Sequence, residues 1–143
     1  MPQITIIYFQ AMLIKNLSAH KYFWFSLAVA WTLLIAVLCL ISFKKLPSVV
    51  SIPSADKYVH SIFHLVFTLL WYLHFRRIQN KKWLLLKMFL CSLLYGCLIE
   101  LLQQWFTDTR KADLNDVAAN SFGATLAVLL ILLYGKFAKK KAL

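Results

Sequence analysis

The chain of 143 residues contains few cysteines, prolines or acidic side chains. Its three cysteines, at positions 39, 91 and 97, fall inside apolar runs and form no C-x-x-C pair. Neither a zinc site nor a disulfide framework is therefore expected. Two of the three prolines, Pro47 and Pro53, lie close together and mark a connection where a helix should not continue. The length is that of a single domain.

The chain also lacks the polar residues of a soluble domain. Hydrophobic residues make up 62% of the sequence, and the mean hydropathy is +0.71. A globule of this composition would expose too much apolar surface to water. The net charge of +11 does not indicate nucleic acid, because the lysines and arginines cluster beside long apolar runs. We therefore expect a membrane protein whose basic residues flank its spans, and no nucleic-acid partner.

Four apolar runs approach the length of about 20 residues that a helix needs to cross the hydrocarbon core. They cover residues 22–43, 59–75, 83–106 and 117–137. We predict an all-α integral membrane protein, built as a compact bundle of four transmembrane helices. Residues 22–137 then form one membrane domain. Residues 1–21 form a cytoplasmic or interfacial N-terminal segment, with Met12 as an alternative start, and residues 138–143 form a basic cytoplasmic tail.

The distribution of lysine and arginine predicts the orientation of the bundle. Eleven of these residues fall on the side that holds both termini, and five fall on the other side. We therefore expect the N-terminus and the C-terminus in the cytoplasm. The same division places all the acids on the outer side, namely Asp56, Glu100, Asp108, Asp113 and Asp116. The acidic residues were not used in this count, so their grouping on one side is an independent observation.

Polar and small side chains share one helical face at the outer end of each of the last three spans. Their spacings of three or four residues bring them to the same side of a helix. The three sets are Asp56, His60 and His64; Gly96, Glu100 and Gln103; and Asp116, Asn120, Gly123 and Ala127, with Asp113 one turn earlier. Gly96 and the pair Gly123 and Ala127 allow the helices to approach closely beside the polar groups.

Glu100 is the acid expected deepest in the bilayer, about 9 Å along the helix from Phe106. An ionised carboxylate facing lipid there would cost several kcal/mol, so Glu100 should face the bundle interior. Its expected partners are Arg110, His60 and Asn120. The simplest arrangement is a pocket that opens to the outer leaflet and is lined by three helices.

Structural roles are the alternatives for several of these residues. Asp113 or Asp116 could be the N-cap of the fourth helix. Asn120 could make a hydrogen bond between helices without any chemical role. His64 is more often a packing histidine than a ligand, since H-x-x-x-H without a central Glu is a weak motif. Gln103 and Gln104 could simply be interfacial side chains with no role in a site. The convergence of the whole set favours a functional site.

The order of these residues resembles the VanZ-like family. The pattern is D-K-x-x-H, then E-x-x-Q, an arginine seven residues later, and D-x-x-x-N-x-x-G. Its members here are Asp56, Lys57, His60, Glu100, Gln103, Arg110, Asp116, Asn120 and Gly123. The chain departs from the family at Asp108-Thr109, where Pro-Gly is common, and at Ala127, where a second glycine is common.

The resemblance covers about residues 20–137. It implies a multi-pass protein of the bacterial cytoplasmic (inner) membrane. The family's namesake contributes to resistance against the glycopeptide teicoplanin. The resemblance therefore indicates a resistance phenotype and does not identify a reaction.

Three functions are compatible with the predicted site. The first is binding of a lipid-linked or amphiphilic molecule, such as a cell-wall precursor, with Arg110 and Lys57 on a phosphate. The expected ligand-binding residues are Asp56, Lys57, His60, Glu100, Gln103, Arg110, Asp113, Asp116 and Asn120. This function needs no cofactor.

The second is an enzyme that acts on a phospholipid or polyprenyl-phosphate head group, with Glu100 and His60 as candidate catalytic residues. A divalent metal on Asp56, His60, Glu100 and Asp116 belongs to this alternative. The third is a small transporter or flippase that acts as a homo-oligomer and uses the buried acid and histidine as a proton relay.

Overall fold

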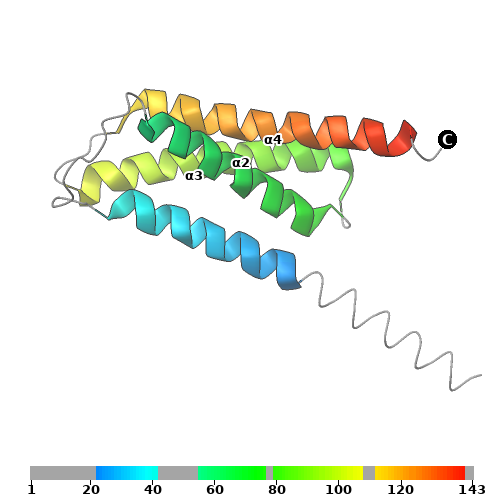
Figure 1. Cartoon of the computed structure of the whole chain (residues 1–143). Coiled ribbons are helices and arrows are strands. Elements are labelled where there is room, and N and C mark those ends of the chain that lie inside the picture. Colours follow the sequence, from blue (N-terminus) through cyan, green and yellow to red (C-terminus); the bar gives the residue numbers. More distant parts are fainter. Residues whose placement is uncertain (1–21, 42–54, 77–78, 108–111, 141–143) are drawn as a thin grey trace, which may run out of the picture.

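The computed structural model describes residues 22–41, 55–76, 79–107 and 112–140. It contains the helix Tyr22–Leu40, α2 (Ala55–Phe75), α3 (Lys81–Phe106) and α4 (Leu114–Lys140). Successive helices run in opposite directions and lie side by side (Figure 1). All four are long and apolar enough to cross a membrane, and the described residues contain no strand. The predicted all-α fold with four spans is confirmed, whereas the orientation stays a prediction.

The helices α3 and α4 begin before their apolar runs, because polar caps define their starts. At α3, the side chain of Asn80 accepts a hydrogen bond of 3.0 Å from the N–H of Lys82. At α4, Asp113 Oδ1 accepts one of 2.8 Å from the N–H of Asn115. Such side chains satisfy the free N–H groups of a first helical turn. The helices therefore begin before the first run of apolar residues.

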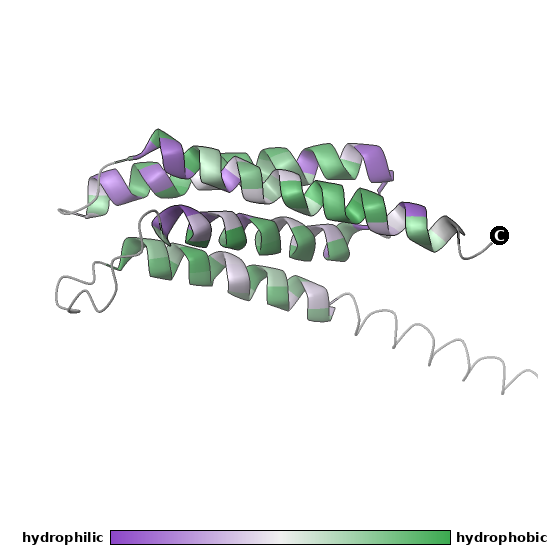
Figure 2. Ribbon diagram, turned by 45° about the horizontal axis from the view of Figure 1, so that its top comes forward, coloured by the Kyte–Doolittle hydropathy of each residue, from purple (hydrophilic) through white to green (hydrophobic). Residues whose placement is uncertain are grey.

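Hydrophobic residues make up most of each helix, and polar residues gather toward the ends of the bundle (Figure 2). Large apolar side chains such as Leu33, Leu94 and Phe122 are exposed on different helices. In water such a surface would be unstable, whereas lipid solvates it well. The surface therefore agrees with four membrane-spanning helices.

The tightest contact between helices joins α2 to α4 at Gly123. A Cβ atom built on Gly123 would overlap the backbone carbonyl of Ser61. The hydroxyl of Ser61 also lies 3.0 Å from the carbonyl of Ala119 and 2.9 Å from the carbonyl of Lys57, so the two carbonyls share its proton. Ala124 and Ala127 are fully buried on the same helix. The small residues of α4 therefore bring the two backbones together, as their spacing predicted.

Side-chain donors attach the Tyr22–Leu40 helix to α2 and α3. Trp31 Nε1 donates to the carbonyl of Phe63 at 3.0 Å, and the Tyr95 hydroxyl donates to the carbonyl of Thr32 at 2.6 Å. Near them, Ile35, Cys39, Phe67 and Ile99 form a buried apolar cluster. The first helix is thus held by both hydrogen bonds and packing.

Candidate functional site

Four acidic side chains lie at the same end of the bundle. Asp56 is in the first turn of α2, Glu100 is near the end of α3, Asp113 precedes α4 and Asp116 is in its first turn. These helix ends lie together, next to the end of the first helix (Figure 1). The predicted gathering of acids is confirmed for these four, while Asp108 lies outside the described residues. We call this end the acidic end.

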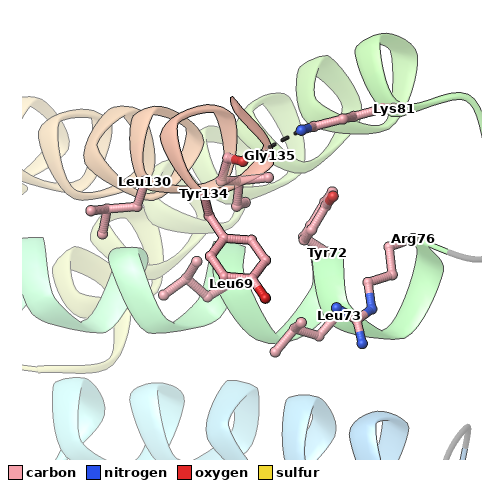
Figure 3. A pocket seen from close by; sticks show the side chains of 9 residues that line it. Leu69, Tyr72, Leu73, Arg76, Lys81, Leu130, Tyr134 and Gly135 are labelled. Atoms are coloured by element: carbon pink, nitrogen blue, oxygen red, sulfur yellow. Dashed lines mark hydrogen bonds between the residues drawn. The ribbon is translucent and has the colours of Figure 1, made fainter. Parts of the chain in front are cut away.

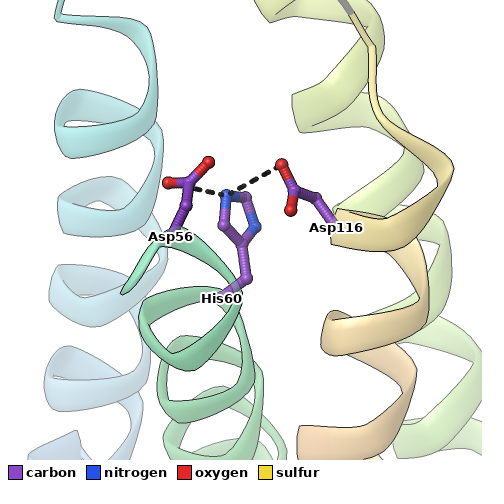
Figure 4. A group of neighbouring side chains, drawn as sticks. All are labelled: Asp56, His60 and Asp116. Atoms are coloured by element: carbon purple, nitrogen blue, oxygen red, sulfur yellow. Dashed lines mark ion pairs between the residues drawn. The ribbon is translucent and has the colours of Figure 1, made fainter. Parts of the chain in front are cut away.

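His60 is at the centre of the acidic end and is only 2% exposed. Its Nδ1 lies 3.1 Å from Asn120 Oδ1, within hydrogen-bond distance. Its Nε2 faces two acids, at 3.9 Å from Asp56 Oδ1 and 4.0 Å from Asp116 Oδ2 (Figure 4). An amide oxygen can only accept a hydrogen bond, so a hydrogen bond in this contact requires the tautomer with the proton on Nδ1. In the neutral ring, Nε2 then carries the lone pair.

Glu100 faces the interior of the bundle, as predicted, and is 3% exposed. Its Oε2 accepts a hydrogen bond of 3.0 Å from the backbone N–H of Asp113, which ties the start of α4 to α3. Its Oε1 lies 3.9 Å from His60 Nδ1 and has no hydrogen-bond partner among the described residues. His60 is thus a neighbour of Glu100, while Arg110, another expected partner, lies outside the described part of the chain.

The structure distinguishes the two acids that could cap α4. Asp113 is the cap, since its Oδ1 accepts from the N–H of Asn115. This hydrogen bond and the nearby Lys57 ammonium hold the pKa of the Asp113 carboxyl below its usual range. Asp116 is buried and points toward His60. Lys57 Nζ lies between them, 3.6 Å from Asp113 Oδ2 and 3.8 Å from Asp116 Oδ1.

Gly96 makes room for the polar side chains of the neighbouring helices. A Cβ atom there would lie 2.6 Å from Asn120 Nδ2 and 3.1 Å from His64 Cε1. His64 is buried, and its Nδ1 lies 2.8 Å from Ser92 Oγ. This contact directs His64 away from the acids and favours the packing role. Gly96 is therefore needed for close approach, as its position on α3 predicted.

Gln103 has a structural contact at the acidic end. It is 2% exposed, and its Nε2 donates a hydrogen bond of 2.9 Å to the carbonyl of Cys39. This bond joins α3 to the end of the first helix. The amide that we expected to bind a ligand is therefore engaged with the backbone.

The polar residues of the acidic end and all but the last residues of the four helices lie inside one family match. The family model described as VanZ/LLP1 matches residues 5–135. The chain belongs to the VanZ-like family. Searches of the curated proteins and of the solved structures gave no match to this VanZ-like protein. The family thus confirms the resemblance that the order of the polar residues indicated.

This VanZ-like protein also has a cavity at the end opposite to the acids, which the sequence did not reveal. It has a volume of about 550 Å³ and lies between α2 and α4 (Figure 3). Apolar residues line its wall, together with Tyr72, Arg76, Lys81 and Tyr134. In the sequence, Arg76 and Lys81 indicated only the orientation of the spans. We call this cavity the basic groove.

Proposed function

We propose that this VanZ-like protein binds an amphiphilic cell-envelope molecule, such as a lipid-linked cell-wall precursor, through its polar head at the acidic end. The buried carboxylates of Glu100 and Asp116 support this most directly. Each has one oxygen that lacks a hydrogen-bond partner among the described residues. Buried groups of this kind are costly inside a membrane and are a common mark of a ligand site.

The chemistry of the site indicates what the head group must provide. Glu100 Oε1 and Asp116 Oδ1 need hydrogen-bond donors, such as sugar hydroxyls or an ammonium group. The ammonium of Lys57, whose side chain is 40% exposed, is positioned to bind a phosphate. We expect Arg110 to add a second cation to the same phosphate. The head group therefore combines donors with an anionic group.

The surface beside the acidic end suits the apolar part of such a molecule. On α3, Leu101, Trp105 and Phe106 are exposed, close in sequence to the buried Glu100. An acyl or polyprenyl chain that packs on these side chains remains in the surrounding lipid while its head enters the site. The ligand therefore needs no channel through the bundle.

Mass spectrometry of lipids that co-purify with the gently solubilised protein tests this function. We expect Asp116→Asn and Arg110→Ala each to lower the amount of the bound amphiphile by tenfold or more, since hydrogen bonds to charged groups contribute about 1.5–3 kcal/mol. The matched controls are Asp113→Asn, which keeps the N-cap, and Lys111→Ala. An unchanged lipid profile in all four variants would contradict the proposal.

We extend the proposal to the resistance phenotype. If the protein binds an acylated glycopeptide, or the precursor that the drug attacks, less drug is bound to its target. Expression of the wild type in a susceptible strain should then raise the inhibitory concentration of teicoplanin more than that of its deacylated form. The Asp116→Asn protein should give no such increase at equal expression.

A further inference from the structure

Three side chains from two helices converge on one point at the acidic end (Figure 4). One ligand atom from each of Asp56, His60 and Asp116 lies within 4.8 Å of the other two. The distances of 3.9 and 4.0 Å from His60 Nε2 to the two carboxylates are too long for hydrogen bonds. Two donors that share one metal ion at about 2.1 Å are about 3 to 4.2 Å apart. The two distances lie at the upper end of this range, so a shared ion would draw the three side chains slightly closer together.

The ring of His60 is oriented as in a metal ligand. In the tautomer with the proton on Nδ1, Asn120 Oδ1 accepts that proton and the lone pair of Nε2 points toward the two carboxylates. Metal-binding histidines typically donate their other ring N–H to a carbonyl or carboxylate oxygen. Asn120 thus provides the supporting contact that such a site requires.

The acids around His60 provide an independent indication of a cation. Asp116 directs Oδ1 toward Lys57 and Oδ2 toward His60, so the two oxygens have different neighbours. Oδ1 of Asp116 and Oε1 of Glu100 are both buried without a hydrogen-bond partner among the described residues. The ammonium of Lys57 lies near Asp113 and Asp116. A divalent ion beside His60 would place further positive charge next to the buried Asp116 carboxylate.

We propose that Asp56, His60 and Asp116 bind one divalent transition-metal ion, Mn²⁺ or Zn²⁺. A mixed set of two carboxylates and one imidazole suits these ions better than Mg²⁺ or Ca²⁺, which prefer oxygen ligands alone. Three protein ligands leave coordination positions open for another molecule. A phosphate oxygen of the head group would occupy one of them. This last step rests on the proposed function, whereas binding of the metal does not.

Metal titration of the detergent-solubilised protein, after treatment with EDTA, tests the site directly. We expect one Mn²⁺ per chain, measured by electron paramagnetic resonance, and a visible absorption spectrum when Co²⁺ is added. Asp116→Asn and Asp56→Asn should each raise the dissociation constant tenfold or more. Asp113→Asn, which removes a nearby charge but no ligand, should bind the ion like the wild type. Asp56 is half exposed, so its variant should fold even if the Asp116 variant does not.

Two outcomes would overturn the metal site. One is the absence of saturable binding by the wild type, and the other is equal affinity in the wild type and the Asp56→Asn protein. Lipid retention is measured on the same EDTA-treated sample. If the metal-free protein still binds lipid, only the contact between the metal and the phosphate of the head group is contradicted. If the protein binds metal but no lipid, only the proposed function is contradicted.

The basic groove provides a second and separate inference. Tyr72 and Arg76 come from α2 and its end, Lys81 from the start of α3, and Tyr134 from α4 (Figure 3). Lys81 Nζ lies 3.4 Å from the carbonyl of Ile131. A Cβ atom at Gly135 would overlap this ammonium, so the glycine allows Lys81 to lie across α4. Three helices thus direct polar groups to one apolar groove.

The charge of the groove indicates an anionic ligand. Each described acid lies at the acidic end, about 30 Å along α2 from Arg76. No described carboxylate is therefore close enough to neutralise Arg76 or Lys81. The phenol groups of Tyr72 and Tyr134 add hydrogen-bond donors, and the aliphatic wall suits an acyl chain. Basic pockets between transmembrane helices are typical sites for acidic head groups.

We infer that the basic groove binds the head group of an anionic phospholipid. Native mass spectrometry of the protein from nanodiscs that contain phosphatidylglycerol and phosphatidylcholine tests this inference. The variant with both Arg76→Gln and Lys81→Gln should retain tenfold less phosphatidylglycerol than the wild type. The control with Lys82→Gln and Lys136→Gln loses the same charge at the same end but keeps the groove, and it should retain the lipid. Equal losses in both double variants would show general charge attraction and would overturn the site.

Discussion

Replacement of Gly123 by alanine should destabilise the bundle by about 3 kcal/mol, the upper range for overpacking of a tight interior. The new methyl group would overlap the backbone carbonyl of Ser61, which cannot move unless α2 separates from α4. The separation would also break the hydrogen bond from Ser61 Oγ to the carbonyl of Ala119. The measurement is the thermal unfolding midpoint of the protein in detergent.

Gly135→Ala is the matched control for this substitution. The methyl group at position 135 would meet only the flexible end of Lys81, which can move aside. Alanine also has the higher helix propensity of the two residues. We expect a change of less than about 0.5 kcal/mol. If the Gly123→Ala and Gly135→Ala proteins had the same unfolding midpoint, this result would contradict the close contact between α2 and α4.

Two substitutions of Glu100 should separate ligand binding from folding. Glu100→Gln keeps an oxygen that accepts the N–H of Asp113, so the start of α4 stays attached to α3. It removes the charge, and the bound amphiphile should fall tenfold or more. Glu100→Leu removes the acceptor as well and leaves a backbone N–H without its partner. We expect it to lose about 1–3 kcal/mol of stability in addition.

The measurements for Glu100 are the co-purified lipid and the unfolding midpoint, taken on the same samples. Gln104→Leu is the control, because Gln104 is exposed on the same helix, and it should change neither value. If the Glu100→Gln protein bound lipid normally, the carboxylate of Glu100 would have no role in ligand binding. Equal stability of the Gln and Leu proteins would show that the hydrogen bond to Asp113 contributes little.

Much of the acidic end follows from local spacing. Asp56 and His60 are four residues apart, as are Asp116 and Asn120, and both pairs lie on one face of their helices. The alternating direction of the spans brings the start of α2, the end of α3 and the start of α4 together. A pattern of apolar runs therefore predicts which acids are neighbours. It does not predict the individual contacts.

The contacts that spacing did not predict depend on helix caps and on distant residues. Whether Asp113 or Asp116 caps α4 depends on the first helical residue, Leu114, which precedes the apolar run. His64 has the same spacing as His60, yet Ser92 on α3 gives it a packing contact. Gln103 bonds to a carbonyl 64 positions away. No local pattern carries such information.

The contact between Ser61 and Gly123 lies directly beside the candidate site. Ser61 follows His60 in the chain, and Gly123 is one turn from Asn120. The two backbones touch there, so they act as a pivot that sets the separation of α2 and α4 at the acidic end. The basic groove lies between the same two helices, farther from this contact. A change that pushes the backbones apart at Gly123 should therefore widen the acidic end as well as destabilise the bundle.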